Sequence, residues 1–117
     1  MAERIPDPLK RRHLLEEDVD PKKARAVAEA YLAEGRAQEA IAFLARAEDR
    51  DALAEISAQA VREGDVFLLR EARLALGSEA DARTWRELAG NASAAGLERY
   101  ASEALRQAER LEDPVRG

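Results

Sequence analysis

The chain has 117 residues and a formal net charge of −5, with 37% charged and only 4% aromatic residues. Alanine, leucine, arginine and glutamate predominate, and these strong helix formers favour an all-α domain over one that contains β-sheet. The absence of cysteine excludes disulfides, a thiol nucleophile and cysteine-ligated zinc, and the acidic balance argues against a nucleic-acid-binding protein.

Residues 1–20 are expected to form an N-terminal arm with one short helix. Two Asp-Pro pairs, at positions 7–8 and 20–21, combine an aspartate that can cap a helix with a proline that suits the first helical position. The first pair predicts a helix over about residues 8–17, and the second predicts the start of the next helix. The leucines of the arm that could dock on the body are Leu9, Leu14 and Leu15.

The hydropathy pattern indicates neither a signal peptide nor a membrane span. The charged, proline-broken N-terminal stretch lacks the apolar segment of a signal peptide. No apolar run approaches the roughly 18 residues that a membrane-spanning helix needs. A cytoplasmic location is therefore expected.

From residue 21 onward, apolar residues recur at the three- and four-residue spacing of amphipathic helices. Glycine or aspartate stands at most of the expected boundaries, as is typical of helix ends and helix starts. The expected helices cover residues 21–34, 37–47, 52–63, 66–76, 79–95 and 97–111. Their short links favour three consecutive antiparallel hairpins.

Four of the later helices carry more specific expectations. Asp51 could cap the helix over 52–63, and Ser78 with Asp81 approximates a capping box for the helix over 79–95. The helix over 66–76 is apolar on most of its circumference and is therefore expected to be central. The last helix carries one apolar stripe, formed by Leu97, Tyr100, Ala101, Ala104, Leu105, Ala108 and Leu111.

Gly35, Gly64 and Gly96, which are 29 and 32 residues apart, would lie between the two helices of each hairpin. A helix–glycine–helix unit that recurs near this period is typical of helical-repeat proteins. The last unit reads Trp85-x2-Leu88-Ala89-x2-Ala92-x3-Gly96-x4-Ala101-x3-Leu105-x2-Ala108. The first unit reads Val27-Ala28-x2-Tyr31-x3-Gly35-x4-Ala40-x3-Leu44-x2-Ala47. Both units resemble the tetratricopeptide repeat in spacing and in residue type.

The middle unit departs from that pattern. Leu69 and Arg73 stand where the repeat has alanine and an apolar residue, and the step of 29 residues is shorter than the repeat. A degenerate tetratricopeptide-like hairpin and a HEAT-like hairpin both stay open for this unit. The resemblance implies an all-α fold in which three antiparallel helical hairpins form a short right-handed α-solenoid over residues 21–112. The N-terminal arm would precede it, and a C-terminal tail over residues 113–117 would follow.

In tetratricopeptide proteins the first helix of each hairpin lines a concave groove that binds peptides or helices. The resemblance carries this role to Lys22, Arg25, Glu29 and Leu32 in the first unit, to Asp51, Ala54, Ala58, Val61 and Arg62 in the second, and to Arg83, Arg86, Gly90, Ser93 and Ala94 in the third. The tentative binding residues among them are Lys22, Arg25, Glu29, Leu32, Arg62, Arg83 and Arg86. Cations prevail in this set, so an acidic segment or a C-terminal carboxylate of a partner is the expected ligand. Glu29, however, stands where the family's carboxylate clamp uses asparagine, and the alternative is that these residues are only the solvated faces of helices.

Catalytic chemistry finds little support in the sequence. His13 is the only histidine and lies in the proline-flanked arm, where no base or pocket is indicated. The carboxylate clusters over 16–20 and 48–51 do not follow the spacing of a calcium-binding loop, and no phosphate-binding glycine motif occurs. We therefore expect no enzyme activity, no metal and no cofactor, and we expect Tyr31 and Trp85 to be core residues.

The function that the sequence favours is a non-catalytic protein-interaction module or adaptor. It would bind a peptide, tail or helix of a partner protein on the concave face of the solenoid. The alternative is a self-associating structural or assembly protein, a homo-oligomer formed through the arm or the terminal helices, because a short repeat array needs covered ends. Nucleic acids and membranes are not expected as partners.

Overall fold

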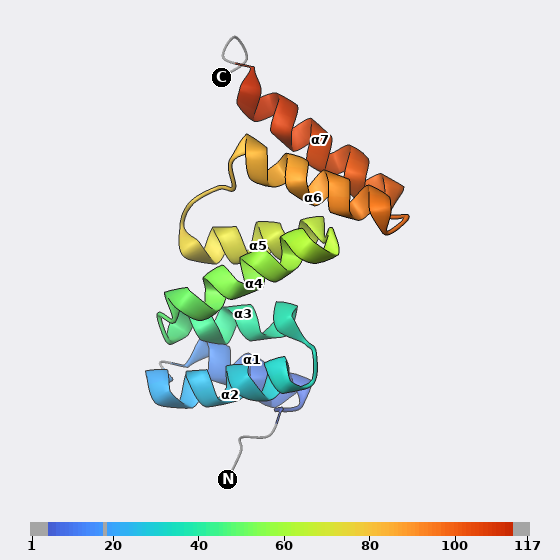
Figure 1. Cartoon of the computed structure of the whole chain (residues 1–117). Helices are drawn as coiled ribbons and strands as arrows, with labels where there is room; N and C mark the ends of the chain where they lie inside the picture. Colours follow the sequence, from blue (N-terminus) through green and yellow to red (C-terminus); the bar gives the residue numbers. More distant parts are fainter. Residues whose placement is uncertain (1–4, 18, 114–117) are drawn as a thin grey trace. The chain divides into compact units, whose positions relative to one another are not determined.

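The computed structural model describes residues 5–17 and 19–113, and these residues form helices and turns without a strand. The helices in chain order are α1 (Pro8–Glu16), α2 (Pro21–Ala33), α3 (Ala37–Arg46), α4 (Arg50–Glu63), α5 (Val66–Leu76), α6 (Ala82–Ala94) and α7 (Glu98–Glu112) (Figure 1). The predicted all-α fold class is confirmed. None of the helices in the described ranges has both the length and the apolarity that crossing a membrane requires. The C-terminal tail expected over 113–117 lies outside the described residues except for Asp113.

The chain divides into two compact units, Met1–Leu53 and Ala54–Gly117, with the division inside α4. In the first unit α2 packs against α3, and in the second α6 packs against α7, with further contacts between α5 and α7. These pairs agree with the antiparallel hairpins expected for the first and last repeat units.

Aspartates begin most of the helices, because a side-chain oxygen can accept a hydrogen bond from an N–H of the first turn that has no partner within the helix. Asp7 and Asp20 cap α1 and α2 as predicted, both with an acceptor distance of 2.8 Å, and Asp65 caps α5 at 3.0 Å. The predicted start of α4 is wrong. Asp49, not Asp51, is the capping residue, since its carboxylate accepts from the Ala52 N–H at 3.1 Å, and the helix begins at Arg50.

The predicted start of α6 is also wrong, by three residues. Asp81 is the N-cap, accepting from the Thr84 N–H at 2.8 Å and from the Thr84 hydroxyl at 2.7 Å. Ser78 cannot serve as a capping residue because its hydroxyl and its carbonyl accept hydrogen bonds from Arg73. Residues 78–81 therefore form a loop between α5 and α6 instead of a first helical turn.

Five helices end in the same type of turn. One residue adopts a positive φ, and the N–H of the next residue donates to the carbonyl five positions earlier, as in a Schellman motif. Glycine takes the positive-φ place in four of these turns, at Gly35, Gly64, Gly77 and Gly96. Glu48, with φ 55°, takes it between α3 and α4, and the Asp49 N–H donates to the Leu44 carbonyl at 3.0 Å.

The core of the first unit is built around a stacked aromatic pair. The rings of Tyr31 and Phe43 lie 5.9 Å apart, and both side chains are fully buried. The Arg11 guanidinium of α1 lies 5.7 Å from the Tyr31 ring and 5.5 Å from the Phe43 ring, and it donates to the Glu39 carbonyl at 3.0 Å. The expected docking of the arm through Leu9 is wrong, because Leu9 is 67% exposed. Leu14 and Leu15 are half-buried.

The core of the Ala54–Gly117 unit is centred on Leu69, Trp85 and Leu88, which are all buried. Small residues from α7 (Ala101, Ala104 and Ala108) complete it. The expectation that α5 is surrounded on most sides is wrong, since Phe67 is 55% and Leu74 is 79% exposed. The apolar stripe expected on α7 is only partly buried, because Leu97, Leu105 and Leu111 remain exposed at the borders of the alanine stripe.

Candidate protein-binding groove

One face of α4 forms the first wall of a groove in the second unit. The α4 residues that line it recur at three- and four-residue steps, as expected for one helix face: Ala54, Ser57, Ala58, Val61 and Arg62. Most of these side chains are small, so they leave room beside this face of α4.

The opposite wall comes from α6 and from the loop that precedes it. Thr84 and Glu87 lie one helical turn apart on α6, and Glu79, Ala80 and Asp81 precede them in the loop. Arg73 of α5 completes the lining, and the space enclosed is about 490 Å³. We call this space the α4–α6 groove.

Two contacts hold the α4 and α6 walls together. The Asn91 side-chain amide of α6 donates to the Val61 carbonyl of α4 at 2.7 Å. At the turn after α4, a Cβ placed on Gly64 would lie 2.5 Å from the Ala92 Cα. The backbones therefore approach as closely as the absence of a side chain allows, and the groove does not depend on a ligand to keep its shape.

The groove carries charges of both signs. Three of its lining residues are carboxylates (Glu79, Asp81 and Glu87) and two are guanidinium groups (Arg62 and Arg73). The Thr84 hydroxyl, followed by the Thr84 N–H, holds the pKa of Asp81 below its usual range. Arg62 donates to Glu55 of the same helix at 3.1 Å, and both side chains remain largely exposed.

The binding residues predicted within the compact unit Ala54–Gly117 are only partly brought together. Arg62 lines the α4–α6 groove, as do the further groove positions Ala54, Ala58 and Val61. Arg83 is exposed but does not line it. Arg86 is exposed and forms an ion pair with Glu112 of α7, at 2.5 Å, which raises the pKa of the arginine through a hydrogen bond.

The predicted residues of the first unit lie along α2. Lys22, Arg25 and Glu29 are exposed, and Leu32 is half-buried. The Arg25 guanidinium lies 3.3 Å from the Asp49 carboxylate, so it helps to hold the residue that caps α4. None of these four residues lines the α4–α6 groove.

Sequence reasoning missed the loop side of the groove. Glu79, Ala80 and Asp81 were expected inside a helix, and Arg73 was noted only as a departure from the repeat. Asp81 carries the one usable signal, because aspartate is among the preferred residues at a helix start.

Over residues 5–17 and 19–113, no three of the metal-binding residue types come close enough to hold an ion. His13, on α1, is exposed and far in sequence from the groove residues.

Comparisons with known proteins give no information about the role of the groove. No model of a protein family matches the sequence, and no curated protein or solved structure is found to be similar to it.

Proposed function

We propose that the chain is a non-catalytic protein-interaction module that binds an extended segment of a partner protein in the α4–α6 groove. The observation that carries the proposal is a preformed space of about 490 Å³ between two helices, with alanine and serine side chains along it. Small side chains let the backbone of a ligand approach, and the charged residues at the sides can fix its register.

The charges favour a segment that carries both signs. Carboxylates outnumber guanidinium groups in the lining, so the acidic ligand expected from the sequence is not part of this proposal. Glu87 offers a site for a basic residue of the partner, and Arg62 offers one for an acidic residue. Complementary charges of this kind contribute more to specificity than to affinity.

The tetratricopeptide-like arrangement of three hairpins remains part of the proposal. Burial of Val27, Ala28, Tyr31, Trp85, Leu88 and Ala89 at the repeat positions supports it, as do the recurring glycine turns. A cytoplasmic location also stays part of it.

Parallel affinity captures with three baits test the proposal. The baits are the unchanged protein, Ala58→Arg and Ala45→Arg. Ala58 is exposed and lines the groove, whereas Ala45 is an exposed alanine of α3 outside it. The unchanged protein and Ala45→Arg should retain the same partner, and Ala58→Arg should lose it because the new side chain occupies the groove. A partner that all three baits retain would show that the groove is not its binding site.

Self-association is the second candidate, favoured by the exposed Leu97, Leu105 and Leu111 of α7. A homo-oligomer that covers these leucines should dissociate on dilution. Light scattering across a hundredfold range of concentration decides this, since a molar mass that stays at one chain throughout would exclude it.

A further inference from the structure

A second cavity of the Ala54–Gly117 unit has a different character from the groove. It is bounded by the end of α5, the following loop, Trp85 of α6 and Gln107 of α7, and it encloses about 490 Å³. Its apolar surface comes from Leu74, Ala80 and Trp85, with Gly77 beside them. We call this cavity the Trp85 hollow. Its volume is within the range of cavities that bind small organic molecules.

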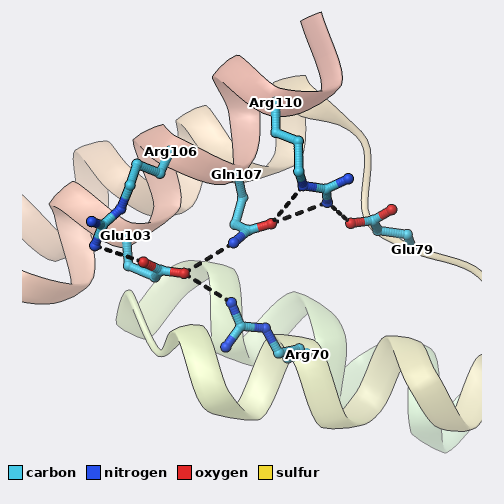
Figure 2. A network of polar contacts seen from close by, with 6 residues as sticks. All are labelled: Arg70, Glu79, Glu103, Arg106, Gln107 and Arg110. Atoms are coloured by element: carbon cyan, nitrogen blue, oxygen red, sulfur yellow. Dashed lines mark hydrogen bonds and ion pairs between the residues drawn. The ribbon is translucent and has the colours of Figure 1, made fainter. Parts of the chain in front are cut away.

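Three of the polar residues that line the Trp85 hollow belong to one continuous network of hydrogen bonds and ion pairs (Figure 2). Arg70 donates to Glu103 at 3.0 Å, and Gln107 donates to the same carboxylate at 2.9 Å. The Gln107 carbonyl in turn accepts from Arg110, which is also paired with Glu79. Arg70, Gln107 and Glu79 are therefore bonded within the protein, so they form a wall without the help of a ligand.

Two lining groups are not satisfied in this way. Arg73 bonds only to neutral oxygen atoms among the described residues, the carbonyl of Ser78 at 3.1 Å and its hydroxyl at 2.7 Å. The Trp85 indole N–H is buried, and it has no hydrogen-bond acceptor within residues 5–17 and 19–113. A buried donor without an acceptor is costly to the folded state.

The charge of the lining favours an anion. Arg70 and Arg73 contribute two positive charges against the single carboxylate of Glu79. Arg70 pairs with Glu103, which Arg106 also contacts, and Glu79 pairs with Arg110. Among the described residues Arg73 is attracted to Asp81 but lies within ion-pair distance of no carboxylate, so its guanidinium can pair with a ligand. Leu74, which is 79% exposed, stands at the opening of the hollow, where it can cover an apolar ligand.

We infer that the Trp85 hollow binds small organic monocarboxylates with an apolar body. The carboxylate would pair with Arg73, and the apolar body would lie against Leu74, Ala80 and Trp85. This site goes beyond the proposed function and does not rest on it. The hollow and the α4–α6 groove share Arg73, Glu79 and Ala80, but Leu74 and Trp85 line only the hollow, and Ala58 lines only the groove.

The fluorescence of Trp85 provides a direct test, because it is the only tryptophan of the chain. Octanoate is the probe, and octanol is the matched neutral molecule. Octanoate should shift the emission of the full chain saturably, and octanol should bind at least about tenfold more weakly because it cannot form the charge-assisted bond to Arg73. Isothermal titration calorimetry with the same two molecules supplies a second readout that does not depend on the position of the indole.

Variants locate the site. Arg73→Gln should remove the preference for octanoate over octanol, and Arg73→Lys should keep part of it. Leu74→Asn should weaken the binding of both octanoate and octanol. Because the Leu74 side chain is exposed, loss of folding is an implausible cause of such an effect. Leu9→Asn and Arg12→Gln are the controls, because both side chains are exposed on α1.

Two results would overturn the inference. One is the absence of saturable octanoate binding in both fluorescence and calorimetry. The other is equal affinity for octanoate and octanol together with no effect of Leu74→Asn. Loss of partner binding in Ala58→Arg with unchanged octanoate binding would separate the groove from the hollow.

Discussion

Glu48 performs, between α3 and α4, the role that glycine performs in four other turns of the chain. A positive φ of this kind costs a residue with a Cβ roughly 1 kcal/mol, whereas glycine adopts it readily. The turn is retained because the Asp49 N–H bonds to the Leu44 carbonyl and the Asp49 carboxylate caps α4.

Replacing Glu48 by glycine should therefore stabilise the protein. We expect Glu48→Gly to raise the free energy of unfolding by about 1 kcal/mol, measured by urea denaturation. Glu48→Ala is the control, since it removes the carboxylate but keeps the Cβ. Equal stability of the two variants would mean that the backbone of the turn is not strained.

Gly64 differs from the other turn glycines in what surrounds it. A Cβ at Gly64 would lie 2.5 Å from the Ala92 Cα and 2.7 Å from the Ala92 backbone nitrogen, whereas nothing lies within 4 Å of a Cβ at Gly96. Both glycines have a positive φ, so both alanine variants share the same backbone cost.

Gly64→Ala should thus destabilise the protein well beyond Gly96→Ala. We expect Gly96→Ala to lower the free energy of unfolding by about 1 kcal/mol through the backbone alone. Gly64→Ala should lower it by about 2 kcal/mol more, because the new Cβ displaces α6. Thermal unfolding of the two variants side by side gives the difference. Similar melting temperatures would contradict the close approach of α6 to the turn after α4.

At the scale of the helices, α1 has no fully buried residue, and polar contacts contribute to holding it on the first unit beside the half-buried Leu14 and Leu15. Arg11 contacts the rings of Tyr31 and Phe43 and bonds to the Glu39 carbonyl. Arg46 of α3 adds a bond to the Glu17 carbonyl just after α1. A cation over aromatic rings contributes roughly 0.5–2 kcal/mol, depending on its exposure.

Arg11→Ala should release α1 while the rest of the unit stays folded. Amide hydrogen exchange of residues 8–16 should become faster by about tenfold or less. This corresponds to a decrease of about 0.5–1.4 kcal/mol in the free energy needed to open α1 locally. Arg12→Ala is the matched control, because among the described residues Arg12 pairs only with Glu16 of the same helix. Exchange of α1 that is unchanged in Arg11→Ala would place the attachment elsewhere.

Glu103 connects α5 with α7 through a charged network (Figure 2). Its hydrogen bond from Gln107, and then those from Arg70 and Arg106, hold the pKa of Glu103 below its usual value. A depressed pKa in the folded state means that the carboxylate contributes stability above its unfolded pKa of about 4.3. That contribution is lost as the pH falls through the lower, folded pKa.

Glu103→Gln should accordingly reduce the sensitivity of the protein to acid. Above about pH 5 the variant should unfold at a lower temperature than the unchanged protein, and below about pH 4 the difference should shrink. Glu109→Gln changes an exposed residue of the same helix. The difference in unfolding temperature between this variant and the unchanged protein should stay constant across this pH range. If Glu103→Gln lowers the unfolding temperature by the same amount at every pH, the network is ruled out as the cause.

The sequence predicted the helices well because their signals are local. Apolar spacing and the caps Asp7, Asp20 and Asp65 each act within one or two turns. Glu48 left no such signal, because nothing in its residue type indicates a positive φ. The start of α6 was misplaced because Ser78 and Asp81 compete for one role, and the bond from Arg73 to Ser78 decides between them.

Most of the candidate site depends on contacts that the sequence cannot indicate. Arg86 was expected to face a ligand, but it pairs with Glu112, which is 26 residues away in the chain. The helical spacing of Leu74 suggests a buried side chain, and only the arrangement of α5, α6 and α7 leaves it exposed. Composition therefore specifies the helices, while the packing of distant segments determines which faces are free.

At the scale of the whole molecule, the central claim is that the α4–α6 groove holds an extended segment of a partner. Isothermal titration calorimetry with the segment isolated from the captured partner is the most direct test. Ala58→Arg should weaken binding at least about tenfold, a loss of roughly 1.4 kcal/mol, whereas Ala45→Arg should stay within about twofold of the unchanged protein. Equal dissociation constants for Ala58→Arg and the unchanged protein would contradict the claim.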